Sequence, residues 1–199
     1  MRSSSKKTAW PDSKLRLILA SASPRRRELL AGMGIQFRVE ISQADEDHAP
    51  YLSPAEIARS NAWRKARAVS RLFPREIVLG ADTVVSLENQ IFGKPRDLAE
   101  AEWMLGQLRG RVHQVITGVC LLRGDPPFQR LFHDLTHVRF HALDDQQVRG
   151  YLGCIDPLDK AGAYAIQEHG DQLVASLEGS LSNVIGLPTE KLGQQLAGL

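Results

Sequence analysis

Residues 17–30, LILASASPRRRELL, set the first unit of the fold. Their apolar start, residues 17–20, is typical of a short buried strand, and the rest begins a helix. Ser23 suits the N-cap of that helix, and Pro24 suits its first position because proline lacks the N–H that is unpaired there anyway. The other free N–H groups and the positive end of the helix dipole favour an anion. The segment therefore predicts a strand, an anion site and a helix, in that order.

The predicted anion site carries hydroxyl groups and fixed positive charge. Ser21 and Ser23 can donate hydrogen bonds to phosphate or carboxylate oxygens, and Arg25, Arg26 and Arg27 place guanidinium groups at the helix start. Serine caps followed by basic residues also open ordinary helices, so phosphate binding and a plain helix start are both open interpretations. The sequence has no Gly-x-x-x-x-Gly-Lys-Ser/Thr motif and no Gly-x-Gly-x-x-Gly motif after a strand, which excludes the common nucleotide loops.

The composition is that of an ordinary globular protein. The chain has 199 residues, 43% hydrophobic and 24% charged, which suits one domain over residues 14–199. Residues 1–13 are basic and polar and predict a disordered leader. The net charge of +2 argues against a general attraction to nucleic acid, and the lack of a long apolar run argues against a membrane span and favours a cytoplasmic location. Cys120 and Cys154 stand alone in apolar surroundings and predict two buried free thiols.

Strand and helix signals alternate along the chain without a repeat or a linker. Capping residues predict helices over residues 54–68, 98–108 and 145–152, and a last helix after Pro188. Strands are predicted over residues 37–41, 77–79, 112–122, 130–140, 164–167 and 173–177, with a hairpin turn at 88–90. Hairpins mixed with crossover helices predict an α/β fold, a single domain with a mixed, twisted central sheet flanked by helices.

Two carboxylate sources are candidates for chemistry. Asp82 follows a predicted strand, the position at which open α/β sheets place reacting groups, although a turn-forming aspartate is the more common occupant of such a position. Glu46 belongs to the acidic loop 45–47, whose oxygen atoms suit Mg²⁺ or Mn²⁺ better than zinc. A solvated acidic loop without a ligand is the alternative interpretation.

Three lysines complete the candidate set. Lys94 and Lys160 lie in glycine-containing loops that let a ligand approach, and Lys65 lies on a basic predicted helix, although single lysines in such places are more often surface residues. His133 and His137, which are four residues apart in a predicted strand, are no metal pair because four strand residues span about 13 Å.

Five segments, in this order and with this spacing, resemble the Maf family. They are LASASPRR at 19–26, GADTVV at 80–85, GKP at 93–95, DKAGAYAIQ at 159–167 and NVIGLP at 183–188. The likeness covers nearly everything from residue 17 onward and implies a Maf/ITPase-like fold. It also implies that the chain hydrolyses nucleoside triphosphates to a monophosphate and pyrophosphate, with Mg²⁺ or Mn²⁺ as cofactor. The family often forms dimers, so a homodimer is expected as one assembly.

The resemblance implies a role for each matching residue. Asp82 matches the catalytic aspartate, described as the proton acceptor, and Arg25, Thr83 and Gln167 match the residues that set specificity. Asp82 could deprotonate water directly or, together with Glu46, hold the metal ion. Polar positions that line the family's pocket are matched by Glu46, Lys65, Lys94 and Lys160, in addition to the phosphate contacts expected of Ser21, Ser23 and Arg26.

The motif details resemble the branch of the family that acts on dTTP and UTP. That branch reads Ala-Asp-Thr at the centre and Ala-Gly-Ala-Tyr later, followed by a glutamine, as this chain does. The Gln167 amide offers a donor and an acceptor for the O4 and N3–H edge of uracil or thymine. One alternative is a 7-methyl-GTP-type pyrophosphatase, whose branch carries Ser-Asp-Gln and Ala-Gly-Ser-Phe instead. Another is a non-catalytic nucleotide- or nucleic-acid-binding regulator of septum formation, suggested by the family and by the basic helix.

Overall fold

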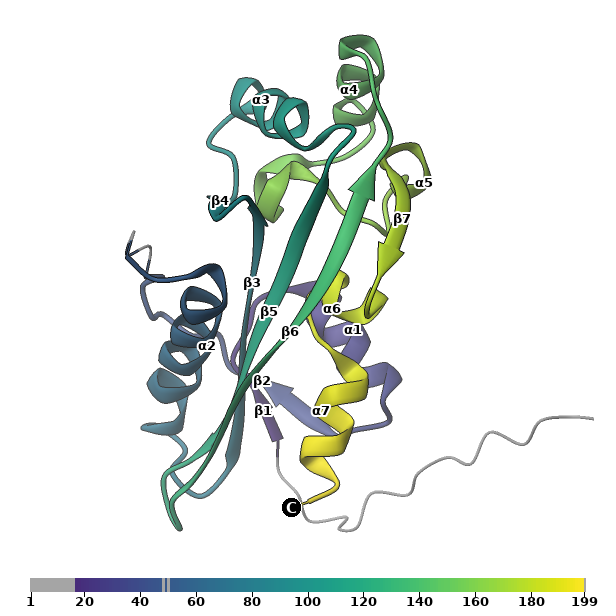
Figure 1. Ribbon diagram of the computed structural model, residues 1–199. Helices are drawn as coiled ribbons and strands as arrows, with labels where there is room; N and C mark the ends of the chain where they lie inside the picture. Colours follow the sequence, from purple (N-terminus) through teal and green to yellow (C-terminus); the bar gives the residue numbers. More distant parts are fainter. Residues whose placement is uncertain (1–16, 48, 50, 199) are drawn as a thin grey trace, which may run out of the picture.

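The computed structural model describes residues 17–47, 49 and 51–198, and the predicted leader, residues 1–13, lies outside them. The described chain forms one sheet with helices around it (Figure 1). The strands are β1 (Leu17–Leu19), β2 (Phe37–Val39), β3 (Ile77–Leu87), β4 (Gln90–Phe92), β5 (Val112–Arg123), β6 (Phe128–Phe140) and β7 (Val174–Glu178). The α-helices are α1 (Pro24–Gly32), α2 (Pro54–Ser70), α3 (Leu98–Leu108), α4 (Asp145–Leu152), α5 (Gly170–Leu173), α6 (Leu181–Ile185) and α7 (Thr189–Leu196), and two 3-10 turns are η1 (Pro157–Asp159) and η2 (Ala161–Ala163).

The sheet is mixed, as the sequence predicts. Its strand order is β2-β1-β3-β5-β6-β7, and β4 pairs with β3 outside this path. β1 runs parallel to β2 and to β3, whereas all other neighbours are antiparallel. The parallel part contains the predicted first strand-helix unit, and the antiparallel part contains the predicted pair of long strands. The expected α/β fold with a mixed central sheet is confirmed.

Helices cover both faces of the sheet. In Figure 1, α2 lies along one face, α1, α6 and α7 lie on the opposite face, and α3 and α4 cover the far end of the long strands. Ala62 and Val78 belong to the core beneath α2, while Leu30, Leu79 and Leu192 belong to the core on the opposite face. Burial of these apolar side chains holds the layers together.

Two glycines let α2 lie directly against the sheet. A Cβ on Gly80 of β3 would stand 2.2 Å from the Ala62 carbonyl oxygen, and a Cβ on Gly118 of β5 would stand 2.2 Å from the Ala58 carbonyl oxygen. No larger side chain fits these positions unless the helix backbone moves away. The close contact brings the polar residues of α2 within reach of β3.

Asp82 lies in the middle of a strand, not just past the end of one as the sequence predicts. β3 continues through Gly80 and Asp82 to Leu87 because β5 pairs with it over residues 78–86. On its other side, β3 pairs with β1 only at residues 77–79 and with β4 only at 85–87. Residues 80–84 therefore have a free edge, at the point where the chain leaves β1 for α1.

Two further predictions are wrong. Residues 164–167, expected to form a strand, are irregular at 164–165 and enter a turn at 166, because the Ala165 backbone bonds to a side chain instead of a neighbouring strand: the Tyr151 hydroxyl accepts from its N–H at 3.1 Å and donates to its carbonyl at 3.3 Å. Cys154 is exposed in the turn after α4, whereas Cys120 is buried on β5 as expected and burial raises its pKa to about 12.

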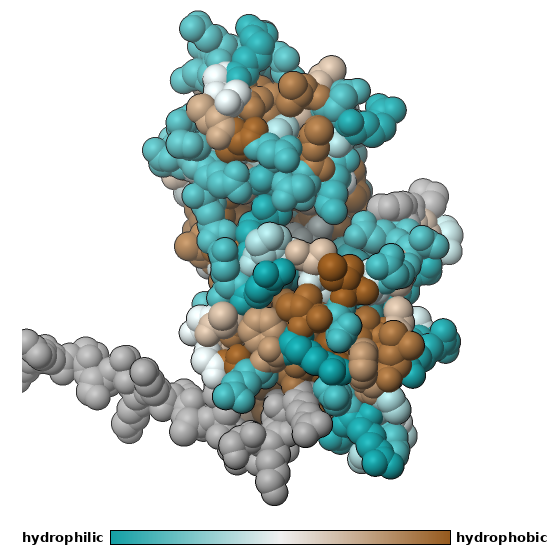
Figure 2. Space-filling model, turned by 180° about the vertical axis from the view of Figure 1, so that it is seen from behind, coloured by the Kyte–Doolittle hydropathy of each residue, from teal (hydrophilic) through white to brown (hydrophobic). Residues whose placement is uncertain are grey.

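The surface of the molecule is mixed in character. Figure 2 shows the face turned away from the viewer in Figure 1, where polar side chains cover most of the upper half and apolar side chains gather in the lower half. In the described part of the chain, no helix is both long enough and apolar enough to span a bilayer.

Candidate active site

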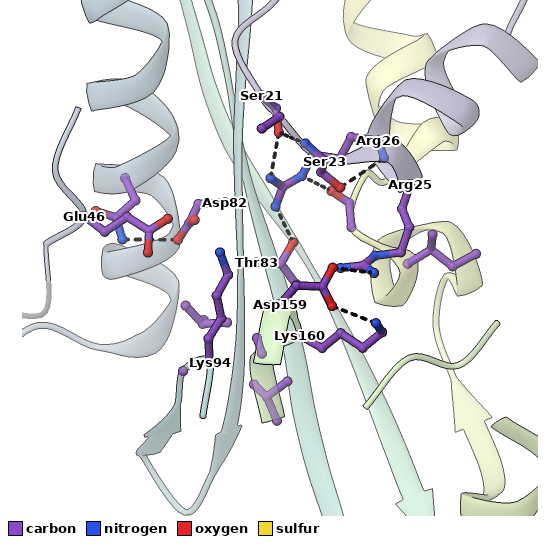
Figure 3. A pocket seen from close by; sticks show the side chains of 18 of the residues that line it. Ser21, Ser23, Arg25, Arg26, Glu46, Asp82, Thr83, Lys94, Asp159 and Lys160 are labelled. Atoms are coloured by element: carbon purple, nitrogen blue, oxygen red, sulfur yellow. Dashed lines mark hydrogen bonds and ion pairs between the residues drawn. The ribbon is translucent and has the colours of Figure 1, made fainter. Parts of the chain in front are cut away.

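A pocket of about 500 Å³ opens at the free edge of β3 (Figure 3). Its walls come from the β1–α1 loop, from α2 and the acidic loop before it, and from the loops around η1, η2 and α6. Five cationic side chains and three carboxylates line it. It contains every site residue predicted from the sequence, namely Ser21, Ser23, Arg25, Arg26, Glu46, Lys65, Asp82, Thr83, Lys94, Lys160 and Gln167.

One ammonium group joins two carboxylates on the α2 side of the pocket. Lys65 Nζ lies 2.6 Å from Asp82 Oδ1 and 2.8 Å from Glu46 Oε1. Asp82 is only 6% exposed, so this ion pair neutralises a carboxylate that has little access to water. Lys65 and Asp82 meet because α2 packs on β3, whereas Glu46 comes from the loop that leads into α2. The arrangement holds two carboxylates next to one cationic centre.

Asn61, which is not among the residues predicted from the sequence, also contacts Asp82. Its Nδ2 donates to Asp82 Oδ2 at 3.2 Å, so each oxygen of the carboxylate has its own donor. Asn61 precedes Lys65 by one helical turn, and residues at that spacing share a face of a helix. This spacing is the one signal in the sequence that could have linked Asn61 to the predicted Lys65.

Arg26 is a cation that contacts only neutral groups in the described part of the chain. Its Nε donates to the Gly186 carbonyl at 2.9 Å, Nη1 to Ser21 Oγ at 3.1 Å and Nη2 to Thr83 Oγ1 at 3.0 Å. Burial lowers the pKa of Arg26, and the charges of Asp82 and Glu46 offset part of that effect. A guanidinium has five N–H groups, so two remain for a ligand.

Ser23 caps α1, as predicted. Its Oγ accepts from the Arg26 N–H at 3.4 Å, and Pro24 stands at the first helical position. The hydroxyl of Thr83 links Arg26 to Thr117 Oγ1, which lies 2.9 Å away on β5. Neighbouring strand residues project to opposite faces of a sheet, so Thr83 meets Arg26 on one face while Asp82 meets α2 on the other.

A second ion-pair cluster closes the opposite wall. Asp159 lies 3.4 Å from Arg25 and 2.7 Å from Lys160, and Glu168 lies 4.0 Å and 3.4 Å from the same two cations. Burial raises the pKa of Asp159, but the Lys160 hydrogen bond and the charge of Arg25 outweigh this effect and leave the pKa below its usual range. Lys160 is only 5% exposed and also donates to the Asp156 carbonyl. The cluster therefore neutralises two cations that the sequence predicts to bind a ligand.

Lys94 and Gln167 stand on the rim of the pocket. Both side chains are exposed, and neither has a hydrogen-bond or ion-pair partner among the described residues. Arg27, the third arginine of the opening segment, is exposed and does not line the pocket. Arg26 and Lys94 are thus the two pocket cations without a carboxylate partner in the part of the chain that the structure describes, and they are free to contact an anion.

The charges are arranged for a polyanionic ligand. The N-terminus of α1, Arg26 and Lys94 offer donors and positive charge on one side of Asp82, and Glu46 lies on the other. Within residues 17–47, 49 and 51–198, no group of three or more His, Cys, Asp or Glu could hold a metal ion without further ligands. The arrangement of charges can hold an anion close to two carboxylates.

The fold and the pocket define an α/β protein with a cation-lined pocket at the end of its first parallel strand. Residues 16–199 match the family described as Maf-like protein, and the chain belongs to the Maf family. It is 51% identical over 180 residues to the dTTP/UTP pyrophosphatase of Symbiobacterium thermophilum, covering 90% of this chain and 92% of that protein. It is 44% identical to the dTTP/UTP pyrophosphatase of Moorella thermoacetica, covering 92% of this chain and 94% of that protein.

The solved structure of the Ham1 protein from Staphylococcus aureus has a similar fold. The TM-score is 0.52, and the match covers 90% of this chain and 99% of the Ham1 chain. The two sequences are 16% identical, so this likeness concerns the fold alone.

Proposed function

We propose that this chain hydrolyses dTTP and UTP to the monophosphate and pyrophosphate. The observation that carries the proposal is the buried carboxylate of Asp82, paired with Lys65 at 2.6 Å, at the edge of a pocket in which cations outnumber carboxylates. The names of relatives that are 51% and 44% identical support the same substrates. Such an activity removes unwanted nucleotides from the pool, and we place it in the cytoplasm as part of the same proposal.

In the proposed reaction, Asp82 acts as the base. A water molecule attacks the α-phosphorus, its proton passes to the Asp82 carboxylate, and the bond between the α-phosphorus and the oxygen that bridges to the β-phosphorus breaks. Pyrophosphate leaves with the electrons of that bond. Lys65 and Asn61 hold the two Asp82 oxygens, so the carboxylate is oriented before the substrate arrives.

The phosphates bind to the cations on the other side of the pocket. Arg26 offers its two unused N–H groups, Lys94 an unpaired ammonium, and α1 the free N–H groups of its first turn. Arg25 joins them once the triphosphate replaces Asp159 as its partner. Charge-assisted contacts of this kind stabilise the negative charge that develops on the departing pyrophosphate.

The residues present fit a divalent cation that binds together with the substrate. Glu46 and Asp82 already approach a single point, the ammonium of Lys65, from two sides. Two carboxylates completed by phosphate oxygens and water suit Mg²⁺ or Mn²⁺, and Glu46 would hold the ion together with the Asp82 oxygen that does not accept the proton. When bound, the ion would lower the pKa of a water ligand and neutralise phosphate charge.

Gln167 reads the base in this proposal. Its exposed amide stands on the pocket rim without a partner among the described residues, so donor and acceptor are both available to the O4 and N3–H edge of uracil or thymine.

The test is a substrate panel. The protein is incubated with dTTP, UTP, CTP and 7-methyl-GTP in the presence of Mg²⁺ or Mn²⁺, and monophosphate and pyrophosphate are measured. We expect dTTP and UTP to be preferred, and Asp82→Asn to lower kcat by about two to four orders of magnitude. Asp145→Asn, which changes an exposed carboxylate outside the pocket, serves as the control.

Three outcomes would contradict the proposal. Release of orthophosphate alone would exclude the reaction type, and a preference for 7-methyl-GTP would favour the purine alternative. Absence of any turnover together with salt-dependent DNA binding would favour the non-catalytic regulator.

A further inference from the structure

Asn61 uses its whole side chain to join three parts of the site. It lies on α2 and is only 2% exposed. Its Oδ1 accepts from the Asp47 N–H at 2.6 Å, and its Nδ2 donates to the Asp47 carbonyl at 3.2 Å and to Asp82 Oδ2 at 3.2 Å. A buried amide with both ends hydrogen-bonded has a fixed orientation. If it were turned over, its NH₂ group would face the Asp47 N–H, and its oxygen would face the Asp47 carbonyl and Asp82 Oδ2.

These contacts tie the acidic loop to Asp82. Asp47 follows Glu46 directly, so the amide that holds the Asp47 backbone also fixes the position of Glu46. The loop has a second attachment, from Arg64 Nε to the Asp45 carbonyl at 2.9 Å, but that contact is exposed and does not reach Asp82. Asn61 alone among the described residues contacts both the loop backbone and the carboxylate on β3.

We propose that Asn61 is a positioning residue that holds the acidic loop over the pocket and fixes the second oxygen of Asp82. This inference rests on the proposed function for its catalytic consequence. Lys65 holds Oδ1 of the carboxylate, and without Asn61 the other oxygen would lack a donor in a site that is nearly closed to water. The carboxylate would then rotate away from the orientation that the reaction needs.

Two variants separate the two contacts. Asn61→Leu has a similar size and removes every hydrogen bond of the side chain. Asn61→Asp keeps an oxygen that accepts the Asp47 N–H, loses the amide donor to the Asp47 carbonyl and to Asp82 Oδ2, and places a second carboxyl group beside Asp82. The control is Ser70→Ala, which removes another buried polar group of α2 whose hydroxyl, within the described part of the chain, bonds only to its own helix, at the Arg67 carbonyl.

The experiment combines kinetics with hydrogen exchange. Exchange of the Asp47 amide is followed by NMR in the nucleotide-free protein, and kcat and KM are measured with dTTP. We expect exchange at Asp47 to be about tenfold faster in Asn61→Leu, with the amides of α2 unchanged, and to stay near the wild-type rate in Asn61→Asp. We expect kcat to fall by about tenfold or more in both variants, and KM to stay within about threefold in Asn61→Leu because Arg26 and Lys94 are untouched.

Each result decides one part of the inference. Unchanged protection of Asp47 in Asn61→Leu would overturn the loop contact, and an unchanged kcat in Asn61→Asp would overturn the role at Asp82. Equal changes of the Asp47 exchange rate and of kcat in Ser70→Ala would mean that Asn61 only stabilises the helix, and would contradict its positioning role. A wild-type protein without activity would reject the proposed function and, with it, the catalytic consequence, whereas the exchange measurement, which needs no nucleotide, would still test the loop contact.

Discussion

At the scale of single residues, the ion pair between Arg25 and Asp159 decides how much positive charge the pocket presents to a ligand. Asp159 lies 3.4 Å from Arg25 and 2.7 Å from Lys160, so one carboxylate holds two cations. An exposed pair of this kind contributes little to stability, typically about 1 kcal/mol or less. The proposed triphosphate competes with Asp159 for Arg25, and the pair must open when the nucleotide binds.

Removing this competitor should therefore tighten substrate binding. In Asp159→Asn we expect KM for dTTP to fall by about two- to fivefold at low ionic strength while kcat stays the same, since the carboxylate no longer has to be displaced. The gain should shrink as salt is added, because ions screen exposed charges. Steady-state kinetics at two salt concentrations measure the change in KM and its dependence on salt.

The matched control is Glu102→Gln, which opens an exposed ion pair with Arg149 that does not line the pocket. That variant should leave KM unchanged. A rise of KM in Asp159→Asn would mean that Asp159 helps to hold Arg25 in its binding position, and that the pair stays closed in the complex.

At the scale of elements, the placement of α2 decides whether its polar residues reach Asp82. The helix lies against Gly80 and Gly118, where a Cβ would overlap with its backbone. Asn61 and Lys65 both lie on this helix, so a small shift of α2 would separate two donors from the carboxylate at once.

We expect Gly118→Ala to damage both stability and activity. The added Cβ meets the Ala58 backbone at 2.2 Å, so the helix must move, and overpacking of this kind costs about 1–3 kcal/mol. The value of kcat should fall by more than the loss of folded protein explains, because the hydrogen-bond donors of Asp82 move with α2. Denaturant unfolding measures the loss of stability. The value of kcat, corrected for the fraction of active protein, measures the loss of rate.

Gly106→Ala is the control for this prediction. Gly106 lies inside α3, and a Cβ there meets nothing within 4 Å. It should leave activity unchanged and stabilise the protein by about 0.5–1 kcal/mol, because alanine favours a helix more than glycine does. If Gly118→Ala behaves in the same way, α2 is not seated by the glycine contact.

The elements also show what sequence can and cannot predict. The N-cap residues Ser23 and Ser53 predict the starts of α1 and α2, because a cap bonds to the backbone of its own first helical turn. β3 could be predicted only as far as Leu79, since Gly80 and Asp82 are poor strand formers and it is pairing with β5 that carries the strand through them. The residues of the pocket could be listed from the family resemblance, whereas the contact of Asn61 with Asp82 depends on a packing distance between two elements that no local pattern encodes.

At the scale of the whole molecule, the far end of the sheet is linked to the pocket through buried aromatic rings. His113 of β5 lies against Phe140, with ring centroids 4.7 Å apart, and its Nε2 is 2.8 Å from the Tyr164 hydroxyl. Tyr164 in turn lines the pocket. Burial lowers the pKa of His113 to about 4 and raises that of Tyr164, so both groups are neutral in the folded protein near pH 7.

This histidine should make the global stability depend on pH. Unfolding returns its pKa from about 4 to the ordinary histidine value of 6.5, so between these values the unfolded chain binds more protons than the folded one. The contribution of His113 therefore falls as the pH falls below 6.5, by up to about 3 kcal/mol near pH 4.

His113→Gln, which keeps a hydrogen-bonding group toward Tyr164 but does not titrate, should lose this part of the pH dependence. Urea unfolding of both proteins at about pH 7.0, 5.5 and 4.5, which spans the titration, measures the difference between their free energies of unfolding. The control is His141→Gln, which changes an exposed histidine. Parallel stability curves for the wild type and His113→Gln would show that the pKa of His113 is the same in the folded and the unfolded protein, and would contradict the lowering by burial.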